Sequence, residues 1–258
     1  MTPTWAKHFA YQVFSFLLSV ALVIFVTDYA ITKTYEERAL NFVKGFSITA
    51  HSGCMGTEEN SLASLEAAVN SGAQSVEFDV RMRSDGVLVM SHDIVNESKS
   101  VPVAKALDYL ADKNIEINFD VKESSCLKEL RALIGEYGII ERCVITGIEV
   151  SDIKNVKLYC SDVEYYLNYS PGRLKIFASD YRERLISLLE NTGAAGINCN
   201  YKYASETLSK CLHENGYKLS VWTVDKERAM KRVLVLKPDN ITTRNVDVLK
   251  NVISEWDK

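Results

Sequence analysis

The sequence lacks an excess of positive charge, a zinc-binding cysteine pattern and a dense cysteine framework. Its formal net charge is -4, which gives no electrostatic footprint for nucleic acid. Any phosphate that it recognises must therefore be met by local groups or by a metal. No Cys-x-x-Cys pair or Cys/His cluster suggests zinc. The six cysteines are scattered through the chain, and we expect mostly buried thiols: Cys54, Cys126, Cys143, Cys160, Cys199 and Cys211.

Histidine is also scarce, with four residues in the chain. His8 precedes a long apolar run, and His213 lies near the end of a helix-like segment, where the helix dipole favours it. His51 and His92 instead fall beside acids at the ends of expected strands. Because an imidazole titrates near neutral pH, these two are the candidates for proton transfer.

Residues 9–27, FAYQVFSFLLSVALVIFVT, form a run of 19 residues without a charge. This approaches the length that crosses a bilayer. A cleaved signal peptide would look similar, but Asp28-Tyr29-Ala30 is a poor cleavage site. A buried helix would stand outside the repeating pattern described below. The run therefore favours an uncleaved membrane anchor.

We expect three parts in the chain: a membrane anchor over residues 1–33, a connector over 34–45 and a globular domain over 46–258. Basic residues flank the apolar run on both sides, so the side of the membrane that the domain occupies stays open. The slight excess after the run leans toward the cytoplasm and comes from Lys33, Arg38 and Lys44.

After the connector, strand-like and helix-like segments alternate. The helix-like segments 61–72, 126–138 and 205–216 each begin near a serine and end at a glycine. Eight such units in about 210 residues are typical of a (β/α)8 TIM barrel, and a doubly wound open sheet is the alternative. The expected strands are 46–51, 75–80, 115–121, 143–147, 163–169, 196–200, 218–224 and 240–243.

Polar side chains gather where these strands end. Side chains alternate along a strand, so Glu77 and Asp79 share one face while the residues between them face the other way. Asn118, Asp120 and Lys122 alternate in the same manner on the next strand, and would be costly inside a barrel without partners. A TIM barrel places its catalytic groups at these strand ends, which also carry His51 and Trp222.

Seven short motifs carry a resemblance to a known family. In chain order they are AHSG (50–53), EENS (58–61), EFD (77–79), SDG (84–86), SHD (91–93), FDVK (119–122) and VWTVD (221–225). Together they resemble the ordered motifs of the glycerophosphodiester phosphodiesterase family. The resemblance implies a TIM barrel, a divalent cation, and hydrolysis of a glycerophosphodiester to sn-glycerol 3-phosphate and an alcohol.

The resemblance also implies roles for individual residues. His51 and His92 would be the general acid and base. Glu77, Asp79 and Asp120 would hold the metal, Ca²⁺ or Mg²⁺, both of which prefer carboxylate oxygens. Lys122 suits the phosphate as a point charge, and Trp222 would form an apolar wall against the substrate.

The chain departs from the family pattern at three places. The family usually has arginine after the first histidine, where this chain has Ser52, and its third metal-binding acid is usually Glu rather than Asp120. The usual Thr-Asp or Thr-Asn before Pro becomes Thr243-Arg244-Asn245. A hydroxyl cannot replace a bidentate guanidinium. We therefore expect a substitute cation near the substrate-binding position of Ser52, with three candidates: Arg81, Arg83 and Arg244.

Two other functions remain open. The related sphingomyelinase D-type phospholipases resemble this barrel and its two histidines, and an anchor would hold such an enzyme beside its lipid. A non-catalytic barrel that binds a phosphorylated ligand is the third reading, because the usual arginine is missing. The expected partners are a glycerophosphodiester or lipid-derived small molecule and the membrane, through residues 9–27, with no nucleic acid.

Overall fold

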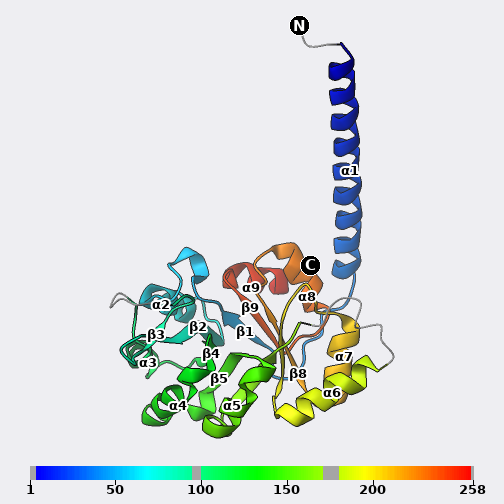
Figure 1. The fold of residues 1–258 in the computed structure, drawn as a ribbon. Helices are drawn as coiled ribbons and strands as arrows, with labels where there is room; N and C mark the ends of the chain where they lie inside the picture. Colours follow the sequence, from blue (N-terminus) through cyan, green and yellow to red (C-terminus); the bar gives the residue numbers. More distant parts are fainter. Residues whose placement is uncertain (1–3, 95–99, 171–179, 257–258) are drawn as a thin grey trace.

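Eight parallel strands close into a barrel with helices around it (Figure 1). The computed structural model describes residues 4–94, 100–170 and 180–256. Residues 1–3 of the expected anchor and 257–258 of the expected domain lie outside this description. Strand β1 pairs with both β2 and β9, which closes the sheet. The predicted TIM barrel is therefore confirmed, and the open sheet is excluded.

The eight predicted strands are all present, each within two residues of its expected ends. The barrel strands are β1 (Ser47–Ala50), β2 (Ser75–Met82), β4 (Glu116–Val121), β5 (Cys143–Ile148), β6 (Glu164–Asn168), β7 (Gly196–Asn200), β8 (Lys218–Trp222) and β9 (Asn240–Thr243). A ninth strand, β3 (Leu88–Met90), pairs antiparallel with β2 and precedes His92. Strand β3 is not one of the eight barrel strands.

One helix follows each barrel strand. These helices are α2 (Leu62–Asn70), α3 (Val103–Leu110), α4 (Leu127–Glu136), α5 (Ile153–Tyr159), α6 (Tyr181–Thr192), α7 (Glu206–Glu214), α8 (Glu227–Leu234) and α9 (Val246–Ser254). The predicted serine starts are confirmed at α2 and α7, where Ser61 and Ser205 each accept a backbone N–H three residues on.

The alternation along β2 and β4 separates the apolar layer from the polar interior. Phe78 and Phe119 pair across the two strands and are fully buried, with ring centroids 5.4 Å apart in an edge-to-face arrangement. The same pairing sets Glu77 opposite Asn118 and Asp79 opposite Asp120. Burial of the aromatic face fixes the register, since a slip of one residue would exchange the two faces. Packing on one face thus positions the acids on the other.

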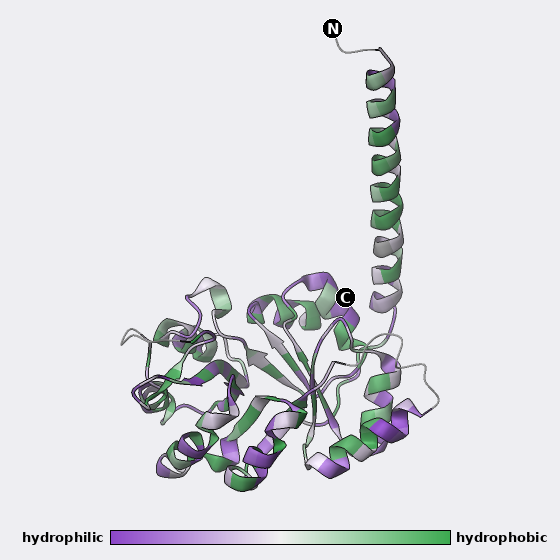
Figure 2. Cartoon of the chain, in the orientation of Figure 1, coloured by the Kyte–Doolittle hydropathy of each residue, from purple (hydrophilic) through white to green (hydrophobic). Residues whose placement is uncertain are grey.

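Most of helix α1 (Thr4–Glu36) projects away from the barrel, and only its C-terminal part contacts it (Figure 1). It runs three residues past the expected anchor boundary at residue 33. It is long and apolar enough to cross a membrane, and none of its most apolar stretch is buried against the barrel. Figure 2 colours most of this stretch green, which marks hydrophobic residues. The exposure is unlike that of a core helix in a soluble protein, although a signal sequence would pass the same test of length and composition.

The cysteines and His213 have structural roles. All six thiols are free and buried, as the sequence predicts. His213 lies at the end of α7 that is far from the barrel mouth. Its Nε2 is 2.9 Å from Asp239 Oδ2, so this ring nitrogen has a hydrogen-bond partner. Two of the four histidines are thus left at the strand ends.

Candidate active site

A cavity of about 370 Å³ opens at the C-terminal ends of the barrel strands. This is the end at which TIM barrels carry their active sites. Ser52 is not among its lining residues. The cavity brings together the seven other predicted site residues: His51, His92, Glu77, Asp79, Asp120, Lys122 and Trp222.

A second cavity of similar volume, about 380 Å³, lies at the opposite end of the barrel. Lys218 and Glu164 pair with each other in its lining, with Nζ 2.8 Å from Oε1. This end of a TIM barrel generally serves stability rather than catalysis. The mouth cavity is therefore the candidate active site.

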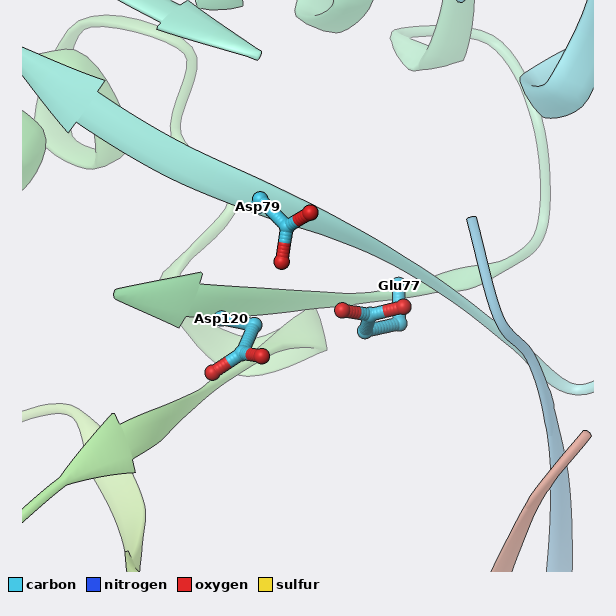
Figure 3. Close-up of side chains that lie close together, drawn as sticks. All are labelled: Glu77, Asp79 and Asp120. Carbon is cyan, nitrogen blue, oxygen red and sulfur yellow. The ribbon is translucent and has the colours of Figure 1, made fainter. Parts of the chain in front are cut away.

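Three carboxylates converge in the mouth cavity (Figure 3). Glu77 and Asp79 come from β2, and Asp120 comes from the paired position on β4. One oxygen from each lies within 4.8 Å of the others. Glu77 and Asp79 are almost fully buried. Such a group of hard oxygen donors has the composition and spacing of a divalent-cation site.

The electrostatics of the cluster fit a cation. Burial raises the pKa of Glu77 to about 7; nearby His51 opposes this rise, and Asp120 and Asp79 add to it. Burial also raises the pKa of Asp120, although Lys122 opposes it. The Oδ1 atom of Asp120 is buried and has no hydrogen-bond partner among the described residues. A buried acceptor without a donor is costly, and Ca²⁺ or Mg²⁺ bound by these carboxylates would satisfy it.

Lys122 lies between two of the acids. Its Nζ is 2.7 Å from Asp79 Oδ1 and 2.7 Å from Asp120 Oδ2. Burial lowers the pKa of Lys122, but Asp120 and Asp79 outweigh burial and hold it above the usual value. The ammonium group is therefore protonated at neutral pH and offsets part of the negative charge.

Asn60 fixes the position of Asp79, and the sequence analysis did not single it out. Its Nδ2 donates to Asp79 Oδ2 at 2.7 Å, and its Oδ1 accepts the Asp79 backbone N–H at 3.0 Å. Asn60 has a positive φ of 55°, a conformation that asparagine tolerates better than most residues. Its place in the EENS motif, beside the helix cap Ser61, was the available signal.

Only glycine allows β5 to approach the carboxylates so closely. Gly147 has a φ of +80°, and a Cβ there would lie 2.5 Å from Asp120 Oδ1 and 2.2 Å from the Val121 carbonyl oxygen. Any side chain would displace both the acid and the backbone of β4.

His51 is held at the end of β1 with one ring nitrogen engaged. Its Nδ1 lies 2.8 Å from the Ser52 carbonyl oxygen, and this nitrogen must donate because a carbonyl only accepts. In the neutral ring Nε2 then carries the lone pair. The Nδ1 atom is also 3.7 Å from Glu77 Oε2, which couples this histidine to the acids.

Ser52 turns away from the cavity and is 1% exposed. Its hydroxyl accepts the Asn60 backbone N–H at 2.5 Å, and its own N–H donates to Glu77 Oε2 at 3.0 Å. The residue thus supports the loop that carries Asn60 and the carboxylate of Glu77. A guanidinium at this position would have to displace these contacts.

His92 is more open, with a side chain 65% exposed at the cavity rim. Its Nδ1 lies 2.9 Å from Asp93 Oδ1. Arg81 Nε donates to the His92 carbonyl oxygen at 2.8 Å, and this contact holds the backbone of the segment that follows β3. Arg83 is paired with Asp85 through two hydrogen bonds in the turn. Neither arginine lines the mouth cavity.

Arg244 does line the cavity. It follows β9, next to His51, because Ala50 pairs with Thr243 and the His51 N–H donates to the Thr243 carbonyl at 2.9 Å. Its Nη1 lies 3.2 Å from Asp225 Oδ2 and its Nη2 lies 2.7 Å from Glu59 Oε1. Two acids that the sequence analysis did not single out therefore orient this guanidinium.

Trp222 contributes both an apolar surface and a polar edge. It closes β8 and lines the cavity. Its Nε1 is buried without a hydrogen-bond partner in the described part of the chain. A buried indole N–H usually finds a partner, so this edge is available to a bound ligand that reaches it.

The fold and the site define a class: a (β/α)8 barrel whose mouth combines a carboxylate cluster with flanking histidines and cations. Residues 44–139 match the model of the glycerophosphoryl diester phosphodiesterase family. A glycerophosphodiester phosphodiesterase of Caldanaerobacter subterraneus is 23% identical over 244 residues, which cover 80% of this chain and 97% of the relative. Over these residues, and in its fold, the chain is similar to members of the glycerophosphoryl diester phosphodiesterase family.

Solved structures share the fold. A phosphodiesterase from Oleispira antarctica, in complex with the product sn-glycerol-3-phosphate, superposes with a TM-score of 0.66 at 17% identity. The match covers 84% of this chain and 98% of that one. A glycerophosphodiester phosphodiesterase from Parabacteroides distasonis gives a TM-score of 0.64 at 21% identity and covers 81% of this chain and 98% of its own.

Proposed function

We propose that this barrel hydrolyses glycerophosphodiesters to sn-glycerol 3-phosphate and an alcohol, with a divalent cation at Glu77, Asp79 and Asp120. The observation that carries the proposal is the convergence of these three acids, within 4.8 Å, in a cavity that also holds His51 and His92. The named activity of the relative from Caldanaerobacter subterraneus and the product complex of the Oleispira antarctica protein support it.

The two histidines move the protons of the reaction. Hydrolysis forms a bond from a water oxygen to phosphorus and breaks the bond from phosphorus to the alcohol oxygen. One imidazole accepts the proton of the attacking water, and the other gives a proton to the departing alcohol. His51 suits the accepting role, because its Nδ1 is engaged with the Ser52 carbonyl and the lone pair lies on Nε2. His92, at the open rim, then faces the leaving group.

Oxygens of Glu77, Asp79 and Asp120 would hold the cation. When bound, it supplies charge that binds and polarises the phosphate. Lys122 adds a second positive charge between two of these acids. The Asn60 side chain keeps Asp79 in place through two hydrogen bonds. Ca²⁺ and Mg²⁺ both suit this set of hard donors.

Metal affinity should fall in acid, because binding requires Glu77 to lose its proton. Without metal, the pKa of about 7 lies above the usual value for a glutamate, so the protonated carboxyl adds to the free energy of unfolding at low pH. This stabilisation is lost as the pH rises through 7. A bound cation favours the carboxylate and reverses this trend. We expect the apparent Kd for Mg²⁺ or Ca²⁺ to rise about tenfold per pH unit below 7. Calorimetric titration at pH 6 and pH 8 measures it, and a Kd that does not vary with pH would contradict this role of Glu77.

Arg244 is the substitute for the family arginine that is missing at Ser52. It is the one of the three candidate arginines that lines the mouth cavity, and it follows the strand next to His51. Its contacts with Asp225 and Glu59 use two of the five N–H donors of a guanidinium. The phosphate can therefore take a charge-assisted hydrogen bond from the remaining donors.

Arg244→Ala should raise KM for a soluble glycerophosphodiester about tenfold or more, since a hydrogen bond to a charged group contributes roughly 1.5–3 kcal/mol. Arg83→Ala is the matched control, because that guanidinium pairs with Asp85 away from the cavity. Arg244→Lys should recover part of the loss. Equal KM values in the wild type and Arg244→Ala would show that the phosphate is held by other groups.

A further inference from the structure

Helix α1 is docked against α8 in a defined direction. Glu36 Oε1, at the end of α1, lies 2.8 Å from Lys231 Nζ in α8. Phe25 and Tyr29, further toward the N-terminus of α1, line a shallow surface cavity together with Glu227 and with Arg228 at the start of α8. The two helices therefore run in the same direction, with the apolar run of α1 leaving from the N-terminal end of α8.

The N-terminal end of α8 lies at the barrel mouth, because α8 follows β8 and β8 ends at Trp222 in the mouth cavity. Phe25 and Glu36 are separated by about 16 Å along α1 at 1.5 Å per residue. The apolar run thus extends past α8 on the mouth side. In Figure 1, α1 and the light-blue loop between β1 and α2 both project toward the top of the view. A membrane crossed by α1 would face the mouth.

Four exposed apolar side chains lie at the same end and in the same sector. Met55 and Leu62 follow β1, Ile94 follows β3, and Val248 lies in the first turn of α9 after β9. Ile94 is 78% exposed and Met55 is 43% exposed. The strands β8, β9, β1 and β2 are consecutive neighbours in the barrel, so this sector adjoins the docking site of α1. Single exposed apolar residues are ordinary, but their gathering beside an apolar helix is informative.

Met55 is an unusual choice at its position. It has a positive φ of 55°, which bulky side chains rarely adopt, and its N–H donates to the Arg244 carbonyl oxygen at 2.9 Å. The loop that carries this exposed thioether is therefore tied to the active-site rim. Asparagine would suit the same backbone better.

We infer that the mouth rests on the membrane leaflet that α1 enters, with Met55, Leu62, Ile94 and Val248 in its headgroup region. The substrate class follows: a glycerophosphodiester whose acyl chain stays in that leaflet while its phosphate enters the mouth. Water attack then releases the headgroup alcohol, and the acylated glycerol phosphate remains in the membrane. The substrate class rests on the proposed function, whereas the orientation does not.

Fluorescence quenching in the full-length protein tests the orientation. Met55→Cys and Ile94→Cys are each labelled with a small fluorophore in phosphatidylcholine nanodiscs, with or without brominated acyl chains. The six native cysteines are buried and give little background. Leu158→Cys, exposed at the far end of α5, is the matched control, and Phe16→Cys in α1 reports insertion.

Labels at Met55 and Ile94 should be quenched about twofold more than the label at Leu158, because interfacial apolar groups lie ~5–10 Å into the headgroup region. The label at Phe16 should be quenched most strongly. Equal quenching at Met55, Ile94 and Leu158 would overturn the orientation, and so would an unquenched label at Phe16.

A kinetic comparison tests the substrate class. Met55→Asn combined with Ile94→Ser should lower kcat/KM severalfold on a single-chain acyl glycerophosphodiester in vesicles, and leave turnover of a water-soluble glycerophosphodiester unchanged. Equal effects on both substrates, or wild-type turnover of the soluble one only, would reject the acylated substrate. If the wild type turns over neither, the proposed function fails, while the quenching result still decides the orientation.

Discussion

His51→Ala and His92→Ala are each expected to lower kcat about 100-fold or more, because general acid and base groups typically contribute at least this much. Both side chains line the mouth cavity beside the acids. The loss should appear in kcat on a soluble glycerophosphodiester, with a smaller change in KM, since the proposed acid and base roles act mainly in the transition state.

His8→Ala provides the matched control, because that imidazole is exposed on α1 and remote from the barrel. The thermal unfolding midpoints of the two active-site variants should stay close to that of the wild type. His92 is exposed, and His51 contacts a backbone carbonyl rather than the apolar core. Turnover within a few fold of the wild type in either variant would remove that histidine from the mechanism.

Asp120→Ala should abolish measurable metal binding and reduce turnover about 100-fold or more, because it would remove one of the three proposed anionic ligands and, with the cation, the positive charge that binds the phosphate. The buried Oδ1 atom of Asp120 has no donor among the residues that the structure describes. Titration calorimetry with Mg²⁺ and with Ca²⁺ measures the binding, and initial rates at saturating metal measure the turnover.

Glu164→Ala is the matched control for charge, because this carboxylate pairs with Lys218 at the opposite end of the barrel. Its metal affinity should equal that of the wild type. Removal of Asp120 also takes one partner from Lys122, which keeps Asp79 at 2.7 Å. Unchanged metal affinity in Asp120→Ala would place the cation elsewhere and contradict the proposed site.

The barrel could be predicted from the sequence because its signals are local and repeated. Alternating strands and helices, serine at helix starts and glycine at their ends each reflect short-range physics. The antiparallel strand β3 was not among the expected strands, since three residues carry too short a pattern to stand out. Its effect is local: it directs His92 toward the mouth.

The placement of the acids could be predicted from strand periodicity, because side chains two residues apart lie on the same face of a strand. Contacts between distant segments did not follow. Asn60 reaches Asp79 across 19 positions, and Glu59 reaches Arg244 across 185 positions. Such pairs depend on how loops close over the mouth, and a single sequence carries little information about loop closure.

The three candidate arginines illustrate the same limit. Strand periodicity alone puts Arg81 and Arg83 on the face of Glu77, yet in the structure Arg81 holds the His92 carbonyl and Arg83 holds Asp85. The hairpin between β2 and β3 redirects both side chains after the strand leaves the barrel. Arg244, which directly follows the last strand, reaches the cavity because the barrel closes β9 against β1.

The most direct test of the account is release of sn-glycerol 3-phosphate from a soluble glycerophosphodiester by the purified full-length protein, with and without EDTA. The account predicts release that EDTA abolishes and that added Mg²⁺ or Ca²⁺ restores. Absence of release at saturating metal, or release that survives exhaustive chelation, would contradict it.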